Sequence, residues 1–305
     1  MNDKDRALLD LLRALDARGY SFITPTPATH ARVVRRKRLA EDLRDILGWS
    51  LPFQCDTLDP DLFALLERAD ALEQHDNHFS CRLRVSRLGQ RLFLHSAYPT
   101  DDRDAVFFGP DSYRFAALLD AEANLIRNRR HIVDLGAGAG VGGLIAATHA
   151  PAARITLCDT NAKALHLAAI NAAFAGVDIE TIAGDCLASL PGDADCVIAN
   201  PPYIVDDRDR AYRHGGAMHG GEVSLEWAKA AAAQLAPGGV LILYTGSAIV
   251  AGRDELKDAL REALNGFTLN YRELDPDVFG EELDHAAYAD VERIAIVALT
   301  AQKPD

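Results

Sequence analysis

The residues best suited to chemistry form the tetrapeptide Asn200-Pro201-Pro202-Tyr203, directly after the apolar run "CVIA". Two prolines remove two backbone N–H donors and cannot continue a sheet, so a buried strand is predicted to end here. The turn then offers only acceptors: the Asn200 side-chain oxygen and the Pro201 carbonyl, which Pro202 holds in one direction. Two fixed acceptors suit a planar NH2 group, whose hydrogens they can bind while Tyr203 covers the plane with its ring.

A second candidate is the glycine-rich stretch "VDLGAGAGVGG", where Gly138, Gly140 and Gly143 fit the pattern G-x-G-x-x-G. Glycines let the backbone approach a ligand closely, and the helix that follows presents free N–H groups to an anion. That anion is a pyrophosphate in NAD or a carboxylate in S-adenosyl-L-methionine. Asp159, about twenty residues further on, can accept the ribose hydroxyls of either cofactor.

Asp134 distinguishes between these two candidate cofactors. It lies two residues before Gly136, at the end of the predicted strand and beside the expected ligand. A carboxylate there favours an ammonium and a sulfonium and disfavours a pyrophosphate. The sequence therefore favours S-adenosyl-L-methionine over NAD.

Both motifs need strands to position them, and from residue 106 onward apolar strand patterns alternate with helical ones. The predicted strands are "RHIVDL", "RITLCD", "IETIAGD", "ADCVIAN", "VLILYTG", "FTLNYRE" and "RIAIVALTA". Such alternation indicates an α/β fold, with a parallel sheet covered by helices on both faces. Ligands of these sheets bind outside the carboxyl ends of the strands, and both motifs fall at such ends.

The first hundred residues have a different pattern. Helical spacing predicts helices over 4–18, 30–48 and 59–72, and alternation on both sides of "RLGQ" predicts a β-hairpin. We therefore expect a smaller domain of helices and a hairpin over 1–105, with the composition of a winged helix, and a catalytic domain over 106–305.

"VDLGAGAG" resembles the first motif of class I S-adenosylmethionine-dependent methyltransferases, and "NPPY" resembles the motif of members that methylate planar nitrogens. The resemblance implies a seven-stranded Rossmann-like sheet and catalysis by Asn200, Pro201, Pro202 and Tyr203. It also implies a cofactor site made of Gly109, Pro110, Asp134, Gly136, Ala137, Gly138, Gly140, Asp159, Thr160, Asp185, Cys186 and Asn200.

The segment "VFFGPDSYRFAALL" precedes the sheet, and its position predicts that Phe108, Gly109 and Pro110 form a turn over the cofactor. Tyr113 or Arg114 would then lie near the methionine end of the cofactor. An equal alternative is an amphipathic helix capped by Asp111 or Ser112.

The substrate is indicated less directly. The stretch "HGGAMHGGEVSLEWAKAAAAQLAPGGVLIL" resembles protein-glutamine N5-methyltransferases, which implies a macromolecular acceptor such as a glutamine amide. The alternative acceptor is the exocyclic amine of an RNA or DNA base. More remote alternatives are an NAD-dependent oxidoreductase and a noncatalytic binding module that keeps the fold.

Charge bears on that choice. The first 105 residues hold 16 Lys and Arg against 17 Asp and Glu, and the other 200 hold 16 against 28, giving a net charge of -13. So acidic a chain disfavours nucleic acid without excluding it. The run "RVVRRKR", residues 32–38, favours nucleic acid, unless it is a solvated helix face compensated by Glu41, Asp42 and Asp45.

Five scattered cysteines, without paired ligand spacing, predict reduced thiols and no metal site, and "HDNH" at 75–78 reads as a polar turn. No apolar run is long enough to span a membrane, and the charged start does not resemble a signal peptide. We therefore expect a cytoplasmic protein.

Overall fold

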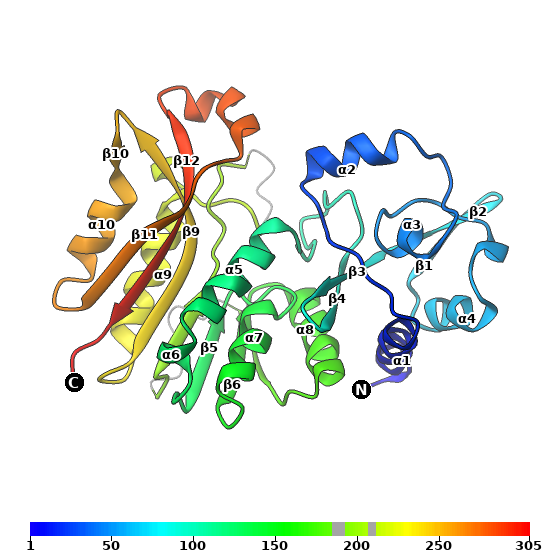
Figure 1. Ribbon diagram of the computed structural model, residues 1–305, viewed down its shortest axis with the longest axis horizontal. Helices are drawn as coiled ribbons and strands as arrows, with labels where there is room; N and C mark the ends of the chain where they lie inside the picture. The colour runs from blue at the N-terminus through cyan, green and yellow to red at the C-terminus, as the bar shows by residue number, and fades with distance from the viewer. Residues whose placement is uncertain (185–192, 207–211) are drawn as a thin grey trace.

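The computed structural model describes residues 1–184, 193–206 and 212–305, and its centre is one large twisted sheet (Figure 1). Neighbouring strands follow the order β11-β12-β9-β8-β5-β6-β7, and a two-residue strand, β10, pairs with β9. The strands are β5 (His131–Leu135), β6 (Arg154–Asp159), β7 (Glu180–Ala183), β8 (Cys196–Ala199), β9 (Val240–Val250), β10 (Arg253–Asp254), β11 (Thr268–Val278) and β12 (Arg293–Gln302).

The predicted parallel sheet is confirmed for β5 to β9, whereas β12 and the short β10 pair antiparallel with their neighbours. β5, β6, β7, β8 and β9 run parallel, but β12 is antiparallel to both β9 and β11. Two parallel neighbours need a crossover connection, usually a helix. Between β11 and β12 the chain has only two short 3-10 helices, η4 (Gly280–Asp284) and η5 (Ala286–Tyr288), so it returns antiparallel.

Helices cover both faces of the sheet (Figure 1). Successive residues of a strand point to opposite faces of the sheet and so belong to two separate hydrophobic clusters. Ile132 belongs to the cluster with α5, α7 and α8, and Val133 belongs to the cluster with α9 and α10. The helices of this part are α5 (Pro110–Ala121), α6 (Ala123–Ile126), α7 (Val141–His149), α8 (Ala162–Ala175), η3 (Met218–Gly220), α9 (Glu222–Gln234) and α10 (Glu255–Ala263). Burial on both faces explains why the strands read as continuous apolar runs.

The N-terminal elements pack beside this sheet, against α8. The expected hairpin is confirmed as β3 and β4, which pair from Leu83 and Ser96 to Leu88 and Arg91. Residues 75–78 form the turn of another hairpin, β1 and β2, that the alternation did not indicate. The elements are α1 (Asp3–Ala17), α2 (Pro27–Val34), α3 (Leu43–Leu47), η1 (Cys55–Thr57), α4 (Pro60–Arg68), β1 (Leu72–His75), β2 (His78–Cys81), β3 (Leu83–Leu88) and β4 (Arg91–Ser96).

One predicted helix, over 30–48, is wrong, because the structure divides it into α2 and α3. The Asp42 side chain accepts from the Asp45 backbone N–H and starts a new helix there. Arginines at 32, 35, 36 and 38 would also lie three or four residues apart on one helix, where like charges destabilise it.

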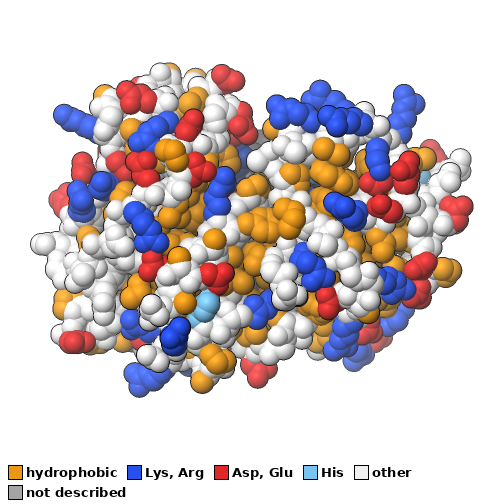
Figure 2. All heavy atoms as spheres, viewed as in Figure 1, with side chains coloured by type: hydrophobic (Ala, Val, Ile, Leu, Met, Phe, Trp, Pro, Cys, Tyr) orange, Lys and Arg blue, Asp and Glu red, His pale blue; other side chains and the backbone are white. Residues whose placement is uncertain are grey.

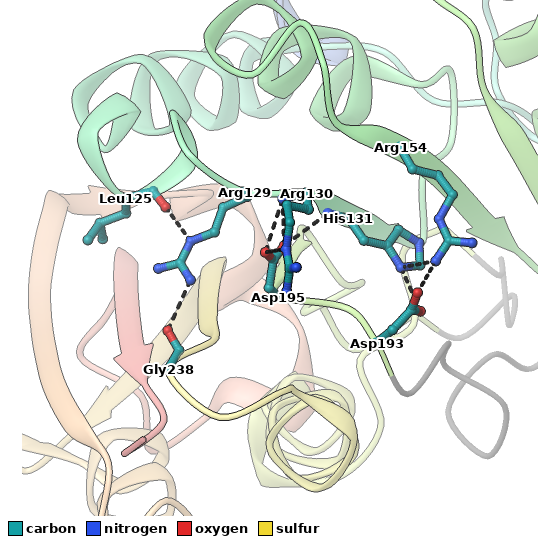
Figure 3. Close-up of polar contacts among 8 residues, drawn as sticks. All are labelled: Leu125, Arg129, Arg130, His131, Arg154, Asp193, Asp195 and Gly238. Carbon is teal, nitrogen blue, oxygen red and sulfur yellow. Dashed lines mark hydrogen bonds and ion pairs between the residues drawn. The ribbon is translucent and has the colours of Figure 1, made fainter.

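The amino end of β5 is held in register by Asp195, which precedes β8 (Figure 3). Its carboxylate accepts hydrogen bonds from the backbone N–H groups of Arg130 and His131 at 3.0–3.1 Å. Next to it, the buried His131 ring contacts Asp193, which also pairs with Arg154. These contacts lie at the end of the strands opposite the two motifs.

Asn171 of α8 joins the N-terminal elements to the sheet. Its side chain, with no exposed surface, accepts from Leu94 N–H at 2.8 Å and donates to the carbonyls of Leu94 and Ala139 at 3.1 and 3.0 Å. Leu94 belongs to β4 and Ala139 to the glycine loop. A single hydrophobic core also contains residues from both parts of the chain.

Within the described ranges, the helices are all too short or too polar to cross a bilayer. The same ranges contain no group of three His, Cys, Asp or Glu residues that could hold a metal ion. Four of the five cysteines are described and all are free thiols: Cys55 is exposed, and Cys81, Cys158 and Cys196 are buried.

Candidate active site

A cavity of about 640 Å³ opens at the carboxyl ends of β5, β6 and β8, where the fold predicts a ligand. The sequence-predicted site residues that line it are Pro110, Asp134, Gly136, Ala137, Gly138, Asp159, Thr160, Asn200, Pro201, Pro202 and Tyr203. The two motifs, 64 residues apart between Gly136 and Asn200, thus meet at one site.

Two predicted residues, Gly140 and Gly109, do not line the cavity. Gly140 caps α7 in the left-handed region, with φ of +83°, and a Cβ there would lie 3.1 Å from the Ala168 side chain. Gly109 caps α5, where a Cβ would lie 2.5 Å from Phe107. Both glycines shape the backbone beside the cavity instead of lining it. Asp185 and Cys186 lie outside the described residues.

The glycine loop turns sharply after β5 because Gly136 and Gly138 adopt φ values of +71° and +53°. A Cβ on Gly136 would lie 2.3 Å from the Trp227 ring, so only glycine fits beneath that ring. A Cβ on Gly138 would meet nothing within 4 Å, and Gly138 lines the cavity. The loop therefore leaves open space at Gly138 for a ligand to approach the backbone.

Asp159, at the end of β6, supports this loop. Its carboxylate accepts from the backbone N–H groups of Gly138 and Asn161, each at 2.8 Å. Burial raises the pKa of Asp159, and these backbone N–H groups oppose that shift. Each carboxylate oxygen retains further acceptor capacity towards the cavity, where a pair of ribose hydroxyls can donate.

Asp134 lies below the loop and is 1% exposed. Its carboxylate accepts from Gly143 N–H of α7 at 2.7 Å. Burial raises the pKa of Asp134 to about 7, and the nearby Asp159 charge adds to the shift. A positive charge arriving in the cavity would favour the ionised form of Asp134.

The Asn-Pro-Pro-Tyr turn follows β8, as the sequence predicts. Among the described residues, no group donates to the Asn200 side chain or to the Pro201 carbonyl, so both acceptors remain available in the cavity. Tyr203 packs its ring on β9, where a Cβ on Gly246 would lie 2.4 Å from Tyr203 Cδ2. The Tyr203 hydroxyl is buried next to Asp111 and Tyr244, and burial raises the pKa of Tyr203.

A glycine-containing loop holds this turn from behind. Gly215 N–H donates to the Ile204 carbonyl at 2.8 Å, and Ile204 N–H donates to the Arg213 carbonyl at 3.1 Å. A Cβ on Gly220 would lie 2.3 Å from the Tyr203 carbonyl oxygen. The glycines of "HGGAMHGG" thus let this loop pack directly on the turn.

Sequence reasoning missed several residues of the cavity wall. The sequence indicates Asp111, in the first turn of α5, only as a helix cap, but its carboxylate accepts from the Tyr244 hydroxyl at 2.8 Å within the buried wall. Burial raises the pKa of Asp111. Trp227 and Phe279 also line the cavity, and Phe279 has an unusual φ of +58°. A lone aromatic residue in a helix or loop carries no sequence signal that separates such a role from core packing.

Comparisons with known proteins find methyltransferases among the relatives of this chain. Release factor glutamine methyltransferase of Deinococcus radiodurans is 34% identical over 154 residues, 47% of this chain and 55% of that protein. Ribosomal RNA small subunit methyltransferase C of Pseudomonas aeruginosa is 34% identical over 117 residues, 38% of this chain and 32% of that protein. This chain therefore spans about half the length of the first relative and about a third of the second.

A solved structure supports the fold. The crystal structure of Trm5b from Pyrococcus abyssi aligns over 80% of this chain and 68% of that chain, with a TM-score of 0.52 and 15% identity. The family model described as "Methyltransferase small domain" matches residues 115–268, half of the chain, which include the glycine loop, Asp159 and the Asn-Pro-Pro-Tyr turn. This chain belongs to the methyltransferase small domain family.

Proposed function

We propose that the protein transfers the methyl group of S-adenosyl-L-methionine to a planar nitrogen of a macromolecule. The observation that carries this proposal is the meeting, in one cavity, of the glycine loop and the Asn-Pro-Pro-Tyr turn. The first can hold the cofactor, and the second offers two acceptors that receive no hydrogen bond from the described residues and that a planar NH2 group needs.

The residues fit this cofactor. The space at Gly138 admits a ligand against the loop, Asp159 can accept the two ribose hydroxyls, and Thr160 lies beside it in the wall. Asp134, ionised, would attract the ammonium and sulfonium groups of S-adenosylmethionine and repel the pyrophosphate of NAD. The same argument disfavours an NAD-dependent oxidoreductase.

When bound, the cofactor supplies a methyl group already activated by its sulfonium. The protein's task is therefore chiefly to position the acceptor, an effect that can supply about 7 to 11 kcal/mol. The Asn200 side-chain oxygen and the Pro201 carbonyl would each accept one hydrogen of the substrate NH2, fixing the nitrogen and favouring the positive charge that develops on it. The Tyr203 ring, held by Gly246, would cover the acceptor plane.

Two acceptor classes fit these contacts. A glutamine amide is suggested by the Deinococcus radiodurans relative, and an exocyclic amine of an RNA base by the Pseudomonas aeruginosa relative. Both present a planar nitrogen with two hydrogens. We propose this shared group as the methyl acceptor.

Two measurements test the proposal. Calorimetric titration with S-adenosylmethionine should show binding, and NADH should give none. Methyl-labelled cofactor incubated with fractionated cell protein and RNA should label one of them. Binding of the cofactor without transfer to any fraction would instead indicate a noncatalytic module, and binding of NADH alone would overturn the assignment.

A further inference from the structure

Four arginines lie close together in the last turn of α2 and directly after it. They are Arg32, Arg35, Arg36 and Arg38, here called the basic edge. All four side chains are exposed. None of them forms an ion pair or hydrogen bond with any residue that the structure describes. This is a concentration of uncompensated charge in a chain whose net charge is -13.

The acidic residues that follow in the sequence do not neutralise this edge. Asp45 is buried and pairs with Lys37 at 2.8 Å, while also accepting from Glu41 N–H. Asp42 caps α3, and Glu41 contacts Lys37 at 3.3 Å. These acidic residues therefore compensate only Lys37. On one continuous helix the arginines and the acidic residues would have shared a face, but α2 ends at Val34.

The basic edge is continuous with the active-site cavity. Arg32 lines the cavity, together with Thr26, Pro27 and Ala28 at the start of α2. Figure 2 shows Lys and Arg side chains gathered over α2, beside the hollow that separates α2 from the acidic corner near η4. A chain bound along the edge would thus lie at the mouth of the cavity.

We infer that the basic edge binds the phosphate backbone of a single-stranded RNA segment and so directs one base into the cavity. This inference rests on the proposed function, of which it selects the RNA-base acceptor. The planar guanidinium group binds phosphate oxygens through paired hydrogen bonds. A base extruded from such a strand needs an aromatic surface to replace stacking, and Phe279 and Tyr203, with ring centroids 6.0 Å apart, offer one in the cavity wall.

The acidity of the rest of the protein fits this arrangement. The net charge of -13 makes contact with a phosphate backbone less favourable over most of the protein, so the basic edge is favoured as the place where a strand binds. Binding should therefore be modest and strongly dependent on salt.

The test compares two variants with equal loss of charge. One replaces Arg32, Arg35, Arg36 and Arg38 with Gln. The control replaces four exposed arginines elsewhere that also lack ion pairs within the described residues, Arg68, Arg127, Arg253 and Arg261. Fluorescence anisotropy with a mixed-sequence single-stranded RNA, between about 50 and 200 mM salt, measures the affinity and its salt slope.

The edge variant should lose about tenfold or more in RNA affinity, and the slope of log K against log salt should fall by up to about 3, from four single-strand phosphate contacts. The control should keep wild-type values. Three results would overturn the inference. They are an equal loss of RNA affinity in both variants, no RNA binding by the wild type, and an edge variant that loses affinity for an acidic polypeptide such as polyglutamate but keeps its affinity for RNA.

Calorimetry with S-adenosylmethionine keeps the two proposals distinguishable. The control variant should bind the cofactor as the wild type does, and so should a variant that replaces only Arg35, Arg36 and Arg38, none of which lines the cavity. Cofactor binding without any RNA binding would refute only the RNA inference, whereas absence of cofactor binding in the wild type would refute the proposed function.

Discussion

At the scale of single residues, the site contains polar groups with few or no partners among residues 1–184, 193–206 and 212–305. None of these residues donates to the Asn200 side chain or to the Pro201 carbonyl, and the buried Asp134 accepts from one backbone N–H group, that of Gly143. Buried polar groups are normally satisfied, so such residues are best explained by a ligand that completes them.

Asn200→Ala should keep cofactor affinity within a few fold of wild type but lower turnover by about 100-fold or more, because one acceptor for the substrate NH2 is lost. Asn200→Asp keeps an acceptor oxygen and should lose less. Single-turnover transfer of labelled methyl to the accepting cell fraction measures both. Wild-type turnover in Asn200→Ala would show that the side chain does not position the substrate.

Asp134→Asn should remove a pH dependence of stability. Because burial raises the pKa of Asp134 from 3.8 to about 7, the folded state binds more protons than the unfolded state between those pH values. Stability is then lost as pH rises through this window, by up to about 4 kcal/mol, and Asn removes that loss. Urea unfolding of the ligand-free protein at pH 5 and pH 8 measures the difference. The variant should gain stability relative to wild type at pH 8, and a constant difference would contradict the shift.

At the scale of elements, short segments hold the Asn-Pro-Pro-Tyr turn and the strand ends in place. The loop containing Gly215 and Gly220 packs on the backbone of Tyr203, and Asp195 fixes the far end of β5. These contacts lie at opposite ends of the strands, so substitutions there should separate catalysis from stability.

Gly220→Ala should lower both stability and turnover. Gly220 has φ of +95°, and its Cβ would lie 2.3 Å from the Tyr203 carbonyl oxygen, so the turn must move. We expect a cost of about 1 to 3 kcal/mol. The matched control is Gly252→Ala, where φ is +70° but nothing lies within 4 Å of the Cβ, so strain alone should cost about 1 kcal/mol with turnover kept. Equal effects on turnover would exclude the contact as the cause.

Asp195→Ala should destabilise the fold by about 1 to 3 kcal/mol, since the N–H groups of Arg130 and His131 lose their acceptor. Asp193→Ala should cost less, because the Asp193 side chain is 68% exposed. Urea denaturation measures the loss, and calorimetry should find cofactor affinity unchanged in both. A larger loss for Asp193→Ala would indicate that the pair with His131 and Arg154 dominates instead.

At the scale of the whole molecule, the N-terminal elements and the sheet behave as joined parts. They share one hydrophobic core, and the buried Asn171 bonds both to β4 and to the glycine loop. A boundary near residue 105 remains our proposal for the domain division, with the 1–105 part presenting the substrate to the cavity.

Asn171→Ala should cost about 3 kcal/mol or more, because Leu94 and Ala139 lose buried hydrogen bonds, and it should weaken cofactor binding through the glycine loop. His166→Ala, on the same helix, breaks an exposed contact with Asp5 of α1 and should cost at most about 1 kcal/mol. Thermal unfolding and cofactor titration measure both. Normal cofactor affinity in Asn171→Ala would show that the link is structural only.

Much of this architecture could be predicted from local patterns. The family, the α/β fold class and the β3-β4 hairpin are confirmed, because strand runs, turn residues and alternation are properties of neighbouring residues. The single helix over 30–48 was wrong, and the parallel sheet is confirmed for β5 to β9 but not for β12. In the first case a new cap at Asp42 competed with helical spacing, and in the second the direction of β12 depended on how residues 279–292 return.

The sequence by itself determined the motifs, their order and their chemistry, since a glycine that must take positive φ or a proline that removes an N–H acts through its own backbone. Only the tertiary structure decided which distant residues meet. Asp111 with Tyr244, Trp227 over Gly136, and Arg32 at the mouth of the cavity are brought together by packing between elements far apart in the chain. Such contacts depend on the burial of many side chains across the whole core. A pattern of neighbouring residues does not contain that information.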